Sequence, residues 1–391
     1  MKDFWIEKKE KKINKRKIFI SIIVAIVLVF ILTIIIIYNV NTDFKRWMDK
    51  TILNKEVFQD TATIIELENE NSKIYAFNKN IGILSKNKFK IYNNFGNKDT
   101  ELDMEITNPI FSSCNRYVAI GERFGQKLYV IEDKKISWDT EIEGEISQIH
   151  INKNGYVVVV ITGTSYKTVV SVFDNSGKQL FSKYLSSTRL ADVCISNDNK
   201  YLALAEVDTS GTIIQSNIKI LSIEKIQEGN KEDVEQTYHG QANSLITNIK
   251  YQDGGKLVCM YDNSIHIIAD QKDEVLIDYN NQKISFSSIE LNSAVINVKE
   301  QSSGLFTADT VVTIINTNNK EEKSYTANEV AKDIYTYENI IALNLGSEIE
   351  FINTDGGLVK RYIAKQEITN TVVSNSVAGI VYRDKVEIIN L

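Results

Sequence analysis

The sequence predicts an all-β fold, a β-propeller of eight four-stranded antiparallel blades, with seven blades as the alternative, preceded by one N-terminal transmembrane helix. Two observations lead to this prediction. The segment FSSCNRYVAI at residues 111–120 recurs without a gap as ISNDNKYLAL at residues 195–204. An uncharged apolar run of 21 residues, from Ile18 to Tyr38, precedes all the repeats.

The repeated segment is typical of a strand, a tight turn and a second, more apolar strand. With the tyrosine of YVAI and YLAL as the marker, Tyr117 and Tyr201 are two of eight copies. The others lie at Ile81, Tyr156, Leu257, Val295, Ile340 and Val377. Steps of 36 to 56 residues between markers fit propeller blades of about 40 residues. The longest step holds a polar segment, residues 223–236, which we expect to be a solvated insertion.

The apolar run has the length of a membrane-spanning helix. From Ile18 to Tyr38 an α-helix would be about 30 Å long, which matches the hydrocarbon core of a bilayer. A cleaved signal peptide would have an apolar core of only about 7–15 residues, followed by small residues at the cut. We therefore expect a signal-anchor helix, with the lipid bilayer as a partner.

Charge sets the expected orientation. Residues 1–17 hold eight basic and three acidic residues, a net charge of +5, and the topology signal next to the apolar run is Lys15, Arg16 and Lys17. The positive-inside rule keeps this tail in the cytoplasm. Because the whole chain carries −6, the remainder carries −11 and lacks the basic stripe that nucleic-acid binding needs. We expect no nucleic-acid partner.

These observations divide the chain into four predicted segments and locate it at the cell membrane, single-pass, with an extracytoplasmic C-terminal domain. The segments are a basic cytoplasmic tail (1–17), a transmembrane helix (18–38), a juxtamembrane connector (39–60) and an extracytoplasmic β-propeller (61–391).

The last repeat is one strand short. It has predicted strands at 369–373, 377–382 and 385–389 only. One spare strand, TATIIELE from Thr61 to Glu68, precedes the first complete repeat. If this ring-closing strand completes the last blade, no strand edge is left unpaired.

Turn sequences carry a family resemblance. FDNSGKQLFSKY and INTDGGLVKRYIA are similar to turns of quinoprotein-type propellers, and SNDNKYLAL is similar to the WD40-like repeat. With the anchor, the layout over about residues 61–391 resembles a domain-of-unknown-function family of single-pass, membrane-anchored bacterial β-propellers. The resemblance implies a propeller fold and an envelope location. Quinone-cofactor enzymes carry periodic blade tryptophans, whereas only Trp138 follows the connector here, so we expect no cofactor.

Residues that could support catalysis are few. His150, His239 and His266 lie in three different predicted blades, and none has a second histidine or cysteine at metal-ligand spacing. No GxSxG, P-loop or HExxH motif is present. The three cysteines, Cys114, Cys194 and Cys259, lie on separate predicted blades, which argues against a disulfide framework. We expect neither a metal site nor catalytic residues.

The function predicted is a non-catalytic protein-interaction scaffold in the bacterial cell envelope, with another envelope protein as its partner. The alternative is a propeller that binds or hydrolyses a glycan or small molecule in its central channel. That alternative needs carboxylates or aromatic rings converging on the innermost strands. Glu122, Glu206, Asp208 and Tyr261 follow the second strand of their blades, so they need not face the channel.

Overall fold

The computed structural model describes residues 15–40, 48, 62–230, 232–241, 244–279, 282–304 and 307–391. The chain divides into two compact units, Met1–Val57 and Phe58–Leu391. Nearly all of the predicted connector, 39–60, lies outside the described residues, as does Thr61.

Helix α1 (Lys15–Val40) is the described element of the first unit. It contains the predicted span of residues 18–38 and continues past it at both ends. Between Ile22 and Ile37 apolar side chains lie on every face of the helix, with Leu28 and Phe30 among many that are mostly exposed. Across the residues that the structure describes, no helix is found that is long and apolar enough to cross a membrane.

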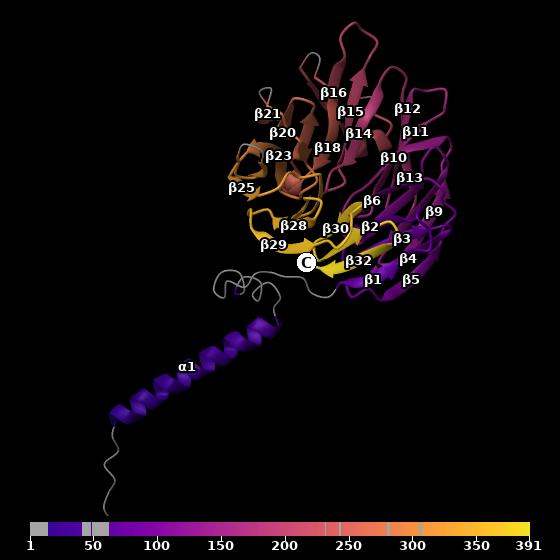
Figure 1. The fold of residues 1–391 in the computed structure, drawn as a ribbon. Helices are drawn as coiled ribbons and strands as arrows, with labels where there is room; N and C mark the ends of the chain where they lie inside the picture. The colour runs from indigo at the N-terminus through magenta and orange to yellow at the C-terminus, as the bar shows by residue number, and fades with distance from the viewer. Residues whose placement is uncertain are drawn as a thin grey trace, which may run out of the picture. The chain divides into compact units, whose positions relative to one another are not determined.

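The second unit consists of eight four-stranded antiparallel sheets, built from 32 strands among the described residues (Figure 1). The first four sheets are β2 (Lys73–Phe77), β3 (Asn80–Ser85), β4 (Lys88–Asn93), β5 (Lys98–Asp103); β6 (Pro109–Cys114), β7 (Tyr117–Glu122), β8 (Lys127–Glu132), β9 (Lys135–Glu141); β10 (Glu145–Ile151), β11 (Val157–Thr162), β12 (Thr168–Phe173), β13 (Gln179–Leu185); and β14 (Arg189–Ile195), β15 (Tyr201–Asp208), β16 (Gln215–Ser222), β17 (Val234–His239). The next three are β18 (Ile246–Tyr251), β19 (Leu257–Tyr261), β20 (Ser264–Ala269), β21 (Lys272–Asp278); β22 (Phe286–Ser288), β23 (Ala294–Ser302), β24 (Ala308–Asn316), β25 (Glu322–Ala327); and β26 (Asp333–Tyr337), β27 (Ile340–Asn344), β28 (Glu348–Asn353), β29 (Leu358–Ile363). The last combines β30 (Asn370–Val373), β31 (Val377–Val381) and β32 (Lys385–Asn390) with β1 (Thr63–Glu66).

The eight-bladed prediction is confirmed, and the seven-bladed alternative is wrong. Each marker of the repeat lies in or beside the second strand of its own sheet, and the strand order within every sheet is consecutive apart from β1. The first strands contact one another around the ring, for example β6 with β10 and β2 with β30. First strands are therefore innermost, as a propeller requires.

The last blade takes its outer strand from the start of the propeller. β1 pairs antiparallel with β32, with Thr63 opposite Ile388 and Glu66 opposite Lys385, and the two strands lie side by side in Figure 1. After β1, the Leu67 amide donates to the Asp384 carbonyl at 2.8 Å. Glu68 then forms an ion pair with Lys90 of β4, in the first blade. The first and last blades are thereby joined through one short segment.

The core lies between blades. The second strand β11 is buried on both faces because Val157 and Val159 pack against the second blade, whereas Val158 and Val160 pack against the fourth. A strand covered on both sides is expected to be a continuous apolar run. The segment GYVVVVI in the sequence is such a run.

The repeated Ser–Asn pattern is explained by the turn it forms. The Ser196 hydroxyl accepts hydrogen bonds from the backbone amides of Lys200 and Tyr201, at 3.1 and 2.9 Å. Asn199 and its counterpart Asn115 adopt left-handed φ values of 62° and 53°. Asparagine tolerates this region better than most residues, which accounts for its place before the second strand.

The described residues of the segment 223–236 are mostly exposed, but part of the segment has regular structure in the fourth blade. They contain the short helix α3 (Ile223–Gln227) and the start of the outer strand β17. Ile223 is buried, and it packs with Ile226, three residues later, on the core between the third and fourth blades. Asp233 is also buried, in an ion pair with Lys183. The charged composition concealed two apolar residues at helical spacing.

Candidate functional site

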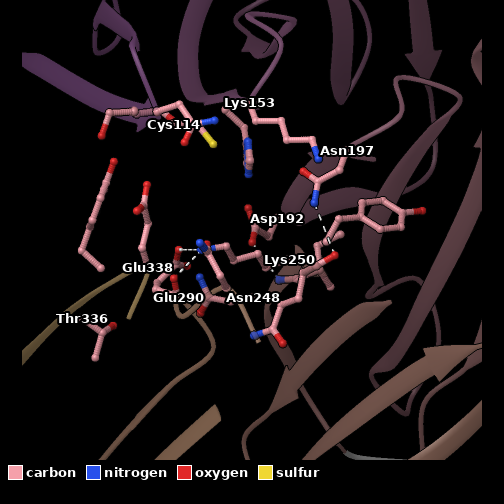
Figure 2. Close-up of a pocket in the computed structure, with 18 of the residues that line it drawn as sticks. Cys114, Lys153, Asp192, Asn197, Asn248, Lys250, Glu290, Thr336 and Glu338 are labelled. Carbon is pink, nitrogen blue, oxygen red and sulfur yellow. Dashed lines mark hydrogen bonds and ion pairs between the residues drawn. The ribbon is translucent and has the colours of Figure 1, made fainter. Parts of the chain in front are cut away.

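A cavity of about 650 Å³ lies where the innermost strands of six consecutive blades end (Figure 2). Its walls come from β6, β10, β14, β18 and β26 and from the residues that follow β22. We call it the channel-mouth site. The residues used below are Phe111, Cys114, His150, Lys153, Asp192, Lys250, Asp253, Glu290, Tyr335, Tyr337 and Glu338, all of which line the cavity.

Lys250 of β18 and Glu290, after β22, form the central ion pair. The Lys250 ammonium lies 3.2 Å from Glu290 Oε2 and also donates to the Glu290 backbone carbonyl. The side chain of Glu290 is 56% exposed, because it reaches into the open cavity. The positive charge of Lys250 lowers the pKa of the Glu290 carboxyl. The Glu290 carboxyl is therefore ionised at neutral pH.

Asp192 of β14 has a different environment. Its two carboxylate oxygens accept hydrogen bonds from the Ile249 amide at 2.8 Å and the Val193 amide at 2.9 Å. A register shift in the β14–β15 pairing falls between Leu190 and Asp192. Burial raises the pKa of Asp192 to about 7, since the backbone donors only partly compensate for lost hydration. Asp192 therefore titrates near neutrality.

Two further titratable groups face the cavity from other blades. His150 of β10 is neutral, because burial lowers its pKa to about 4. Its Nδ1 atom is buried and has no hydrogen-bond partner among the described residues. Glu338 follows β26, and burial raises the pKa of its carboxyl. The charge of Lys250 and the Tyr337 hydroxyl oppose the shift at Glu338 only in part.

Aromatic rings occupy the same end of the channel. The rings of Tyr75 and Phe111, on the innermost strands of the first two blades, stack with centroids 4.0 Å apart and an angle of 7°. Tyr335 and Tyr337 contribute two half-buried rings from β26. Burial raises the pKa of Tyr335 to about 12, so its hydroxyl stays protonated.

The carboxylates singled out from the sequence do not line this cavity. Glu206 pairs with Lys219 at 2.8 Å, and Glu122 accepts from the amides of Thr107 and Asn108 at 2.7 and 2.9 Å. The ring of Tyr261 lies against His266, with centroids 4.8 Å apart. These side chains have structural partners.

The remaining candidates are scattered. His266 lies 3.0 Å from Asp273, and His239 lies 2.6 Å from Asn217. Cys114, Cys194 and Cys259 are free thiols. In the part of the chain that the structure describes, no group of three or more His, Cys, Asp or Glu side chains could hold a metal ion.

Sequence reasoning considered His150 and Cys114 but missed the other channel-mouth residues used here, although one signal could have identified some of them. Asp192, Lys250 and His150 are polar residues inside the first strand of three successive blades, within three residues of its end. In a propeller the first strand faces the channel, so polar residues at matching positions of successive copies converge there.

A second surface lies at the opposite end of the ring. We call it the loop-end surface. Its six apolar side chains are between 40% and 63% exposed: Phe124, Tyr166, Tyr184, Ile213, Ile214 and Leu245. They lie in or beside loops that connect second to third strands, or fourth strands to the next blade. All these loops are at the end where innermost strands begin, on the second, third and fourth blades and the start of the fifth.

The loop-end surface has aromatic and charged components. The rings of Tyr166 and Tyr184 contact each other, with centroids 4.8 Å apart. Phe124 lies at the junction of two blades, because its amide donates to the Ile146 carbonyl at 2.8 Å. Exposed charges of both signs belong to the same loops and strand ends: Arg123, Glu143, Glu145, Lys167 and Arg189.

Fold and site together define an eight-bladed β-propeller with a polar channel mouth. Over residues 54–391 the sequence matches the family described as "Family of unknown function (DUF5711)", and the chain belongs to that family. No curated protein sequence matches it significantly. The expected resemblance to a family of unknown function and to WD40-like propellers is confirmed at the level of fold.

Two solved structures show the same architecture. BamB from Moraxella catarrhalis is 15% identical with a TM-score of 0.52, over 85% of this chain and 99% of that one. The C-terminal WD40 domain of Sif2 is 11% identical with a TM-score of 0.53, again over 85% and 99%. At these identities the likeness shows the fold alone.

Proposed function

We propose that this protein is a membrane-anchored, extracytoplasmic propeller that acts as a non-catalytic scaffold and docks another protein of the bacterial envelope. The observation that carries the proposal is the loop-end surface, where six exposed aromatic and aliphatic side chains belong to loops and strand ends at one end of consecutive blades. Clusters that include tyrosine and phenylalanine are typical of protein-binding surfaces, and rigid propeller loops present them without an ordering cost.

The proposed anchor is the apolar segment from Ile18 to Tyr38. Within α1, exposed apolar side chains on all faces would be unfavourable in water but suit a lipid environment. Lys15, Arg16 and Lys17 adjoin the segment and favour a cytoplasmic N-terminus. The acidic domain then lies outside the cytoplasm.

The charges beside the loop-end surface favour a protein partner over a lipid surface. An anionic membrane would be matched by a uniformly basic rim. Here Arg123, Lys167 and Arg189 alternate with Glu143 and Glu145. A mixed polar rim around an apolar centre is the common composition of a non-obligate protein interface.

The test is co-purification of the full-length protein from cross-linked, detergent-solubilised membranes. We expect one stoichiometric envelope protein with the native chain and at least about a tenfold loss of it with the double variant Tyr166→Ala/Tyr184→Ala. The control is Phe95→Ala, which removes an even more exposed aromatic side chain at the opposite end of the propeller and should leave recovery unchanged.

Two results would contradict the scaffold function. One is recovery of the native protein alone under conditions that cross-link known envelope complexes. The other is equal recovery of the partner with the double variant, which would move the interface away from the loop-end surface.

A further inference from the structure

The geometry of the channel mouth points to a second activity, beyond docking: we propose that this cavity binds a small organic amine, which pairs with carboxyl groups of the lining, those of Asp192 and Glu338. The other polar groups of the ligand would contact His150 and the tyrosines of β26. The inference does not depend on the docking function, which uses the opposite end of the ring.

The first argument is charge balance. Four carboxyl groups line the cavity, those of Asp192, Asp253, Glu290 and Glu338, against two ammonium groups, those of Lys153 and Lys250. Lys250 is committed to Glu290, which leaves an excess of negative charge. Neither Asp192 nor Glu338 has an ion-pair partner among the described residues. A ligand ammonium would supply the missing counter-charge.

The second argument is that these carboxyl groups already resist ionisation. Burial raises the pKa of Asp192 and that of Glu338, which means that the groups around each carboxylate compensate only in part for its lost hydration. An ammonium ligand would lower both pKa values. By thermodynamic linkage, the same ligand binds more tightly to the ionised carboxylates than to the protonated carboxyl groups.

The third argument concerns the rest of the cavity. His150 also lines the cavity, and because burial lowers its pKa it adds no positive charge that would compete with a ligand ammonium. Tyr335 and Tyr337 add aromatic faces, which attract cations as well as apolar carbon. At about 650 Å³ the cavity has the volume of sites for small organic molecules.

The carboxyl groups are poorly arranged for a metal ion. Asp192, Glu290 and Glu338 come from three different blades, and both oxygens of Asp192 already accept backbone hydrogen bonds. No set of three ligating side chains is found among the described residues. An organic cation needs only one or two carboxyl contacts and can use the aromatic wall.

The experiment is calorimetric titration of the full-length, detergent-solubilised protein at pH 7, where glucosamine is mainly protonated. The probes are 1,4-diaminobutane, spermidine and glucosamine, with N-acetylglucosamine as the uncharged counterpart of glucosamine. We expect saturable binding of at least one amine and binding at least about tenfold weaker for N-acetylglucosamine.

Variants locate the site. Asp192→Asn and Glu338→Gln, which remove charge at nearly constant shape, should each weaken amine binding by about tenfold or more. Asp139→Asn, on the exposed outer strand of the second blade, is the matched control and should bind as the native protein does. If Asp192→Asn and Glu338→Gln leave the circular dichroism spectrum and the recovery of the partner protein unchanged, their effect on amine binding is independent of folding and of the docking surface.

Three results would overturn the inference. They are the absence of binding by all three amines up to about 10 mM, equal binding of N-acetylglucosamine, and equal weakening by Asp139→Asn. Equal weakening by Asp139→Asn would mean that amine binding depends only on the overall negative charge of the protein.

Discussion

The hydroxyl of Tyr362, on the outer strand of the seventh blade, donates a 2.5 Å hydrogen bond to the Glu387 carboxylate in the last blade. Tyr382 lies 2.6 Å from the same hydroxyl, and Lys385 donates to Glu387 at 2.7 Å. Although burial opposes it, these donors hold the pKa of Glu387 below its usual value. Glu387 also faces Ile64 of β1 across the β1–β32 pairing, so this buried polar link lies beside the closing strand.

Closure by β1 can be tested with two fragments, one starting at Asn41 and one at Asn69. We expect the shorter fragment to unfold at a temperature lower by about 5 °C or more, because it exposes the edge of β32 and removes Ile65 from the core. Ile65→Ala in the longer fragment should cost more than Ile64→Ala, since Ile64 is mostly exposed. Equal melting temperatures for the two fragments would contradict the closing role.

A buried amide links the fifth and sixth blades. Gln252 Nε2 lies 2.9–3.0 Å from the backbone carbonyls of Ile289, Leu291 and Ala294, and Gln252 Oε1 accepts from Thr317 at 2.8 Å. These hydrogen bonds add to the backbone pairing of β22, which is short because the strand has only three residues.

Gln252→Ala should lower the free energy of unfolding by about 2–4 kcal/mol, because it leaves buried carbonyls and a hydroxyl without this partner. Denaturant unfolding measures the change. The exposed Gln301→Ala, on β23, should stay within about 0.5 kcal/mol of the native protein. A similarly small effect at Gln252 would show that these hydrogen bonds are replaced by water.

Asp192 and His150 have opposite effects on stability as the pH changes. The pKa of Asp192 rises from 3.8 to about 7 on folding, so its contribution to stability falls between those pH values as the unfolded state ionises first. The pKa of His150 falls from 6.5 to about 4, so its contribution falls as the pH drops through that window. In the native protein the two effects offset each other.

Single variants should reveal each effect. Relative to the native protein, Asp192→Asn should gain about 1–3 kcal/mol in free energy of unfolding from pH 4 to pH 7, and His150→Gln should gain a similar amount from pH 6.5 down to pH 4. Unfolding by urea at several pH values measures both. Parallel stability curves for the three proteins would mean that channel water hydrates both groups fully.

The blade count was predictable because second strands are apolar on both faces and their turns reuse Ser and Asn. Segments such as GYVVVVI and YLALAEV have the same environment in every blade, so they resemble one another. Helix α3 was missed because Ile223 and Ile226 are two apolar residues in a charged segment.

The channel-mouth site was harder to predict for a different reason. Lys250 and Glu290 are 40 residues apart, on different blades, and their pairing depends on the register of each innermost strand. Polar residues on those strands give no local signal of what they face. Only the ring geometry brings Asp192, His150 and Glu338 to one cavity.

Site-specific photo-cross-linking in living cells tests the docking function most directly. A photo-reactive phenylalanine analogue is placed at position 166, on the loop-end surface, or at position 95, at the opposite end of the propeller. The account predicts one discrete adduct with an envelope protein from position 166 and none from position 95. The same adducts from both positions, or adducts with lipid alone from position 166, would contradict it.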